Sequence, residues 1–132
     1  MELTNSETTK LTHQEIFDKV YLGLQSQGWE QSVTPGGCKY RAGKLKCAAG
    51  WLIPNDIYTF NVEGYSVNVL PSDRLKKYFP MLDTPEKVIF VRELQDVHDN
   101  ASKPEYMESR FNEYAKFNGL EIPTKETVNE NL

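Results

Sequence analysis

Long apolar runs are missing from this sequence. The segment Val88-Ile89-Phe90-Val91 is among the longest, whereas a helix needs about 20 apolar residues to cross a bilayer. The chain also does not open with the basic-then-apolar pattern of a signal segment. We therefore expect a cytoplasmic protein with no membrane partner.

The sequence also has few cysteines and no excess of positive charge. Cys38 and Cys47 are the only cysteines, and in an intracellular protein such a pair is more often two reduced thiols than a disulfide, which is the alternative. They stand farther apart than the roughly two to four residues of a zinc knuckle, so we expect no metal and no cofactor. The net charge of -4 argues against the basic surface that general nucleic-acid binding requires.

The composition that is present fits a globular protein. Hydrophobic residues make up 39% of the chain and charged residues 26%, which is typical of a folded domain. Residues 1–10 and 123–132 are polar and without pattern, so we expect flexible ends on either side of a single domain over residues 11–122.

Capping signals predict most of the secondary structure. Thr12 and Glu15 form a capping box at the start of a helix that ends at Gly28. Three further helices are expected to begin at Ser72, at Thr84 and at Ser102. Residues 48–70 fit short helices or strands equally well. The predicted fold class is α+β, a single helix-rich domain with one β-hairpin or a small antiparallel sheet.

The segment CKYRAGKLKC, residues 38–47, alternates with period two and predicts that hairpin. With a turn at residues 42–43, Cys38 lies opposite Cys47. A three-residue loop with Gly43 in a bulge would instead shift the register by one residue and separate the thiols. The face that does not carry the thiols collects four cations: Lys39, Arg41, Lys44 and Lys46.

Like charges opposite each other on a strand pair repel unless an anion lies between them. Either the protein's own carboxylates and water neutralise these cations, or a partner does, namely an anionic small molecule or an acidic protein surface. Arg41 is the strongest candidate, because a guanidinium grips phosphate with two parallel hydrogen bonds. The backbone N–H groups of Gly36 and Gly37, and stacking by Tyr40 and Trp51, complete the predicted ligand-binding set.

Cys47, His98 and Asp99 form an alternative site, as the nucleophile, base and orienting acid of a small cysteine hydrolase. Against it, His98 falls on the apolar face of a predicted helix, where a structural histidine is the commoner occupant. Neighbouring residues on a helix also point about 100° apart, so we expect Asp99 not to orient the His98 ring. The sequence therefore favours a protein that is not an enzyme.

The order of its motifs resembles a set of small uncharacterised proteins encoded by bacteriophages and their hosts. The motifs are C-x-Y-R at residues 38–41, K-C-A-x-G-x-L-I-P at residues 46–54 and L-Q-x-x-H-D at residues 94–99. The resemblance implies a phage-type accessory protein of the host cytoplasm, for which counter-defence is the expected service. We therefore predict a binding protein that presents its basic hairpin to an anionic partner. An oligomeric structural protein is the further alternative.

Overall fold

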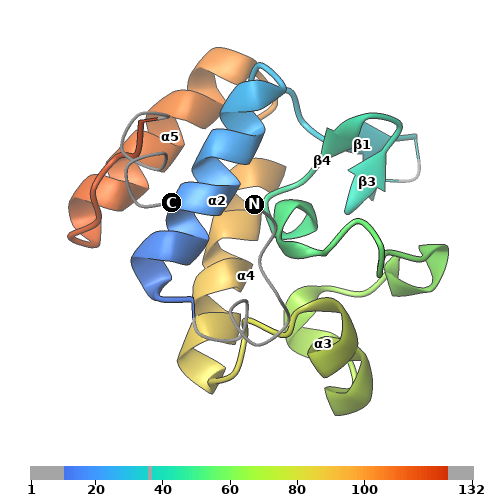
Figure 1. Cartoon of the computed structure of the whole chain (residues 1–132). Helices are drawn as coiled ribbons and strands as arrows, with labels where there is room; N and C mark the ends of the chain where they lie inside the picture. The colour runs from blue at the N-terminus through green and yellow to red at the C-terminus, as the bar shows by residue number, and fades with distance from the viewer. Residues whose placement is uncertain (1–10, 36, 125–132) are drawn as a thin grey trace.

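Four helices build the larger part of the molecule in the computed structural model, which describes residues 11–35 and 37–124. The helices are α2 (His13–Ser26), α3 (Ser72–Tyr78), α4 (Pro85–Asp99) and α5 (Pro104–Phe117). Figure 1 shows α2, α4 and α5 gathered together, with α3 and the strands on one side of them. The fold is α+β and rich in helix, as the sequence predicts.

Two of the predicted helix starts are confirmed in atomic detail. The Thr12 hydroxyl accepts the backbone N–H of Glu15 over 3.1 Å, and the Glu15 carboxylate accepts the backbone N–H of Thr12 over 3.0 Å. This is the capping box that the sequence predicts. Thr84 caps α4 in the same manner by accepting the N–H of Lys87. At the other end of α2, Gly28 has a φ of +70° and closes the helix.

The helix predicted to begin at Ser72 does begin there, but neither Ser72 nor Ser102 caps its helix. α3 begins at Ser72 itself, with Pro71 in the N-cap position and no side-chain cap bond. α5 begins at Pro104 after the N-cap Lys103, so Ser102 lies one residue too early. Proline favours the first position of a helix and disfavours helical geometry in the residue before it. Pro104 therefore sets the start of α5, whereas Pro71 is the N-cap of α3 and immediately precedes its first residue.

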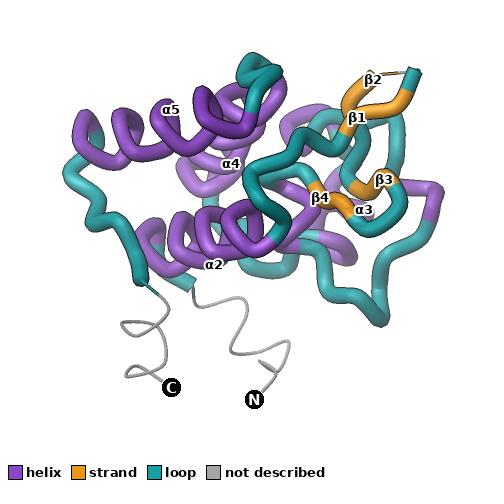
Figure 2. Tube along the Cα trace, turned by 90° about the horizontal axis from the view of Figure 1, so that it is seen from above, coloured by secondary structure: helices purple, strands orange, loops and turns teal. Residues whose placement is uncertain are grey.

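Two short hairpins replace the single predicted one. The strands are β1 (Val33–Thr34), β2 (Gly37–Cys38), β3 (Arg41–Ala42) and β4 (Leu45–Lys46), paired β1–β2 and β3–β4. Figure 2 shows both hairpins on the same side of the helices. Arg41 lies opposite Lys46, so the turn is Gly43-Lys44, one residue later than predicted. Gly43 has a φ of +63°, a left-handed conformation that glycine adopts readily and that places the turn there.

This register separates the two cysteines. Cys38 is exposed in β2 and lies opposite Val33. Cys47 is buried, and its N–H donates to the Tyr40 carbonyl oxygen over 3.2 Å. Both thiols are free, so the predicted pairing of Cys38 with Cys47 across the hairpin is wrong.

The segment after the β3–β4 hairpin packs closely against that hairpin and against α2. It forms three short 3-10 helices: η1 (Ala49–Leu52), η2 (Phe60–Val62) and η3 (Val67–Val69). A Cβ atom on Gly50 would lie 2.2 Å from the Tyr40 carbonyl oxygen, and one on Gly23 of α2 would lie 2.3 Å from the Trp51 ring. η1 therefore touches the hairpin through Gly50 and α2 through Trp51, at distances that only glycine permits.

The core is formed by side chains from three helices and the segments between them. The largest fully buried ones include Phe17, Leu24, Leu94, Met107 and Phe111. After α5 the chain returns to α2, where the Gln14 amide and the Glu121 backbone exchange two hydrogen bonds of 2.9 Å. Of the predicted flexible ends, residues 1–10 and 125–132 lie outside the described residues. Within those described, no helix combines the length and the apolar character that a membrane span requires.

Candidate anion-binding site

The β3–β4 hairpin brings two cations onto one neutral oxygen. Arg41 Nη2 donates to Asn55 Oδ1 over 2.9 Å, and Lys46 Nζ donates to the same oxygen over 3.0 Å. Arg41 Nη2 also donates to the Ile53 carbonyl oxygen over 3.0 Å, which fixes the position of the guanidinium. Two positive charges therefore lie next to each other with an uncharged group between them.

No carboxylate forms an ion pair with Arg41 or Lys46 among residues 11–35 and 37–124. The ion pairs found there are Lys87–Asp83, Arg92–Asp96 and His98–Asp99. Glu63 lies near the hairpin, but its oxygens accept the backbone N–H groups of Tyr40 and Arg41 over 2.9 and 3.1 Å. The Tyr58 hydroxyl donates to Glu63 as well, over 2.6 Å. Glu63 thus fixes the backbone of β3 and leaves the guanidinium without an ion pair.

Aromatic rings support both cations. The guanidinium carbon of Arg41 lies 4.3 Å from the centroid of the Tyr58 ring, and Lys46 Nζ lies 4.4 Å from that of Trp51. Both are cation–π distances. The Trp51 ring also packs on Gly23 of α2. In this arrangement the ring positions Lys46, which differs from the predicted role of stacking on a base.

Burial and mutual repulsion act on the cations together. Desolvation lowers the pKa of Arg41, and the nearby Glu63 charge offsets part of this effect. Desolvation, followed by the charges of Arg41 and Lys19, lowers the pKa of Lys46. Lys19 on α2 therefore adds a third positive charge near the pair. Arg41 Nε and Trp51 Nε1 are buried and have no acceptor in the described part of the chain, and buried donors in this state usually indicate a missing partner.

The remaining members of the predicted ligand-binding set are scattered. Lys44 is exposed in the turn, Lys39 is half-buried, and Gly37 is exposed in β2. Tyr40 is buried, with its hydroxyl donating to a backbone carbonyl oxygen over 2.5 Å. Gly36 lies outside the described residues. From that set the structure brings together Arg41, Lys46 and Trp51.

Comparisons with known proteins add no assignment to this geometry. No protein-family model, curated protein or solved structure matches the chain. Its function is therefore argued from its own residues.

Sequence reasoning missed Asn55, Glu63 and Lys19. Asn55 and Glu63 come from the irregular segment after η1, which has no periodicity that would place a side chain. Lys19 is an exposed residue of helix α2, and nothing in the helical pattern distinguishes it from other surface lysines. The one available signal is Asn55 directly after Pro54, because this dipeptide indicates a turn. It does not predict which residues the Asn55 side chain contacts.

A second polar cluster joins the β1–β2 hairpin to the end of α4. The His98 ring is fully buried, with Nδ1 2.8 Å from Asp99 Oδ1 and Nε2 accepting the backbone N–H of Ser32 over 3.1 Å. Gln95 Nε2 donates to Asp99 Oδ1 over 2.6 Å, and the Cys38 thiol also bonds to Asp99. The expectation that Asp99 does not orient His98 is wrong, because the Asp99 carboxylate bonds to His98 Nδ1. Gln95 and Cys38 hold the same carboxylate in place.

Cys38, His98 and Asp99 lie close enough to suggest a metal centre, but the hydrogen bonds of the His98 ring exclude a metal there. One ligand atom each from Cys38, His98 and Asp99 lies within 4.8 Å of the others. However, the Ser32 N–H occupies the lone pair of His98 Nε2, so the single proton of the neutral ring is on Nδ1. Nδ1 then has no lone pair for a metal, whereas a ligating histidine donates from its other nitrogen. The cluster is suited to join two elements.

The thiols are poorly suited to nucleophilic catalysis. Burial raises the pKa of Cys47, and its Sγ accepts the Gly50 N–H over 3.3 Å. Desolvation, with the nearby Asp99 charge, raises the pKa of Cys38 to about 11. Because the thiolate is the nucleophile and both groups are thiols at neutral pH, the geometry gives no support to the hydrolase alternative.

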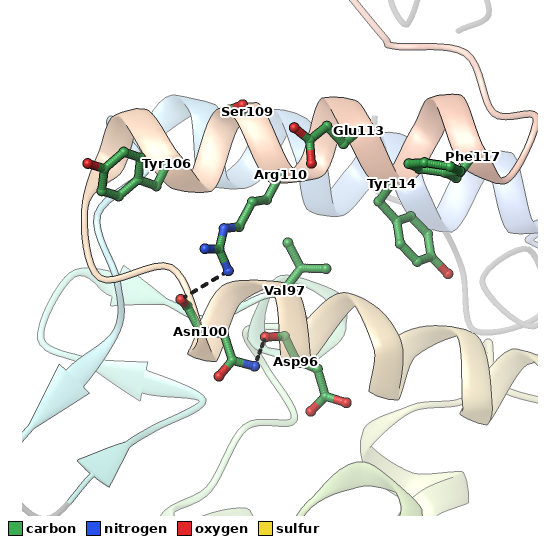
Figure 3. A pocket seen from close by; sticks show the side chains of 9 residues that line it. All are labelled: Asp96, Val97, Asn100, Tyr106, Ser109, Arg110, Glu113, Tyr114 and Phe117. Carbon is green, nitrogen blue, oxygen red and sulfur yellow. Dashed lines mark hydrogen bonds between the residues drawn. The ribbon is translucent and has the colours of Figure 1, made fainter.

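A separate cavity of about 660 Å³ lies between α4 and α5 (Figure 3). Arg110 points across it to the Asn100 carbonyl oxygen, 3.4 Å away. Asp96 of α4 and Glu113 of α5 add carboxylates to its two sides. This cavity contains none of the predicted site residues and presents charges of both signs, so it does not compete with the hairpin as an anion site.

Proposed function

We propose that this protein is a non-enzymatic binding protein that holds an anionic group of its partner at Arg41 and Lys46. The observation that carries the proposal is the contact of both cations with one neutral oxygen, Asn55 Oδ1. Like charges in such proximity repel each other. An oxyanion that reaches both cations replaces this repulsion with two charge-assisted hydrogen bonds.

The rigidity of the site supports the proposal. Glu63 fixes the backbone of Arg41, and the Ile53 carbonyl oxygen fixes its guanidinium. Each cation also lies over a ring, Arg41 over Tyr58 and Lys46 over Trp51. Side chains that are already ordered lose little conformational entropy when a ligand arrives, which strengthens binding.

The proposed ligand chemistry is an oxyanion, which a nucleotide-like small molecule or an acidic protein surface carries. The resemblance to phage-encoded proteins suggests the cell and the process in which this binding takes place. In that setting the protein acts in the host cytoplasm as an accessory factor and counters host defence by sequestering an anionic signal molecule or by covering an acidic host protein.

The test is the double variant Arg41→Gln and Lys46→Gln, titrated at low salt by isothermal calorimetry with inorganic phosphate and with a hexaglutamate peptide. We expect the wild-type protein to bind at least one probe and the double variant to bind it about tenfold or more weakly, because each lost charge-assisted bond contributes roughly 1.5–3 kcal/mol. Lys44→Gln is the matched control, since Lys44 belongs to the same hairpin but is exposed in the turn.

The two probes distinguish the two possible partners. Binding of phosphate alone indicates a small-molecule partner, and binding of the peptide alone indicates an acidic protein surface. A double variant that binds as tightly as the wild-type protein, or a wild-type protein that binds neither probe, would contradict the proposal.

A further inference from the structure

We infer that the group bound at this site is the dianionic phosphate of a phosphate monoester, and that Asn55 is the residue that keeps the site open to it. The inference rests on the proposed function and names its ligand class. Two observations carry it: Arg41 and Lys46 form no ion pair with a carboxylate in the described ranges, and the oxygen on which they meet is neutral.

The charge of the site matches a dianion better than a monoanion. Arg41 and Lys46 contact the same oxygen. The charge of the exposed Lys19 on α2 adds to that of Lys46, whereas the Glu63 charge offsets part of that of Arg41. None of these three cations forms an ion pair with another residue in the described ranges. A carboxylate or a phosphodiester brings one negative charge and leaves repulsion in place. A phosphate monoester carries roughly 1.5 to 2 negative charges at pH 7 and offsets more of it.

The donor geometry also favours phosphate. Arg41 Nη2 is engaged by Ile53 and Asn55, while Nη1 has no hydrogen-bond partner in the part of the chain that the structure describes. Nη1 and Lys46 Nζ are therefore available to different oxygens of one ligand. Phosphate has three terminal oxygens arranged around phosphorus, so it can reach donors from separate strands, whereas a carboxylate offers two oxygens in one plane.

Asn55 is the informative residue, because a different side chain would suit a purely structural site better. If Arg41 and Lys46 served only stability, an aspartate at position 55 would give each an ion pair with almost the same shape. Asparagine orients both cations through the same oxygen but leaves their charge available. We therefore assign Asn55 as a positioning residue that determines which anions bind.

The organic part of the ligand receives little recognition here. Trp51 and Tyr58 are engaged by the two cations, and the Tyr40 hydroxyl is bonded to a backbone carbonyl oxygen. The site therefore reads the phosphate group rather than what is attached to it. Phosphate monoesters with different carriers are expected to bind with comparable affinity.

Adenosine 5′-monophosphate and adenosine 3′,5′-cyclic monophosphate provide a matched pair of probes. They share base and ribose but differ in phosphate charge, so calorimetry on the wild-type protein is expected to give about tenfold tighter binding of the monoester near pH 7.5. The monoester affinity is expected to fall several-fold towards pH 5.5, because the second pKa of such a phosphate is about 6. Equal affinity for the two nucleotides, or a monoester affinity that does not change with pH, would overturn the inference.

The pH dependence arises from the ligand and not from the site. The titratable groups around it are Lys19, Arg41, Lys46, Tyr58 and Glu63. None of them is a histidine, the side chain whose ordinary pKa falls in this interval. If neither nucleotide binds but hexaglutamate does, the anion site stands and the phosphate class is rejected.

Asn55→Asp tests the assignment of the positioning residue. We expect this variant to bind adenosine 5′-monophosphate about tenfold or more weakly, with a thermal midpoint no lower than that of the wild-type protein, because the new carboxylate pairs with both cations. Asn61→Asp, at an exposed position of η2, adds the same charge elsewhere and is expected to change neither quantity. Wild-type affinity in Asn55→Asp would refute the assignment.

Discussion

At the scale of single residues, two side-chain acceptors determine what the hairpin cations do. The Glu63 carboxylate accepts backbone N–H groups, whereas the Asn55 amide oxygen accepts the side chains of Arg41 and Lys46. A carboxylate in the place of Asn55 would form ion pairs with both cations, whereas the Glu63 carboxylate anchors the strand and acts on Arg41 only through its nearby charge. The sequence predicts a face of four cations from its period-two alternation, and of these the structure brings Arg41 and Lys46 together. The sequence does not predict the acceptors, which come from an irregular segment.

The thiols provide a prediction at the same scale. With iodoacetamide at about pH 7.5, we expect slow labelling of native Cys38, and faster labelling as the pH approaches its pKa of about 11, because only the thiolate reacts. Cys47 is expected to react only in the unfolded protein, because it is fully buried. Mass spectrometry after timed labelling measures both rates. Rapid labelling of native Cys47 near neutral pH would instead favour the hydrolase alternative.

At the scale of elements, the site depends on how η1 is held against the β3–β4 hairpin. Gly50 lets η1 touch the Tyr40 carbonyl oxygen, and Gln95 of α4 accepts the Ala49 N–H over 2.9 Å. All three motif segments therefore meet in space: K-C-A-x-G-x-L-I-P supplies η1, C-x-Y-R supplies Tyr40 beside Gly50, and L-Q-x-x-H-D supplies Gln95, which accepts the Ala49 N–H. The motifs therefore describe a structural junction beside the anion site.

Gly50→Ala tests this junction. We expect it to lower the free energy of unfolding by about 3 kcal/mol, because the added methyl group must displace backbone atoms rather than a flexible side chain. Gly28→Ala is the control, since a Cβ there meets open space and costs only the left-handed conformation, about 1 kcal/mol. Urea denaturation compares the two. A loss for Gly50→Ala no greater than that for Gly28→Ala would show that the contact is not close in solution.

At the scale of the whole molecule, the sequence predicts the fold class and the helices but not how the strands are joined. Thr12 and Thr84 cap helices through local hydrogen bonds, which pattern alone identifies. The hairpin register accompanies the left-handed conformation of Gly43 and the hydrogen bond from the Cys47 N–H to the Tyr40 carbonyl oxygen, just outside the strands. The meeting of Arg41 and Lys46 at one oxygen is a tertiary event of the same kind. Self-association stays a prediction.

The central claim is that Arg41 and Lys46 together bind an anion. Thermal unfolding in phosphate and in chloride at equal ionic strength tests it most directly. Phosphate stabilises proteins in general by exclusion from their surface, so the decisive quantity is the difference between the wild-type protein and the Arg41→Gln, Lys46→Gln variant. Specific binding is expected to raise the wild-type midpoint by about 5 °C more than that of the variant. The same phosphate effect in both proteins would contradict the account.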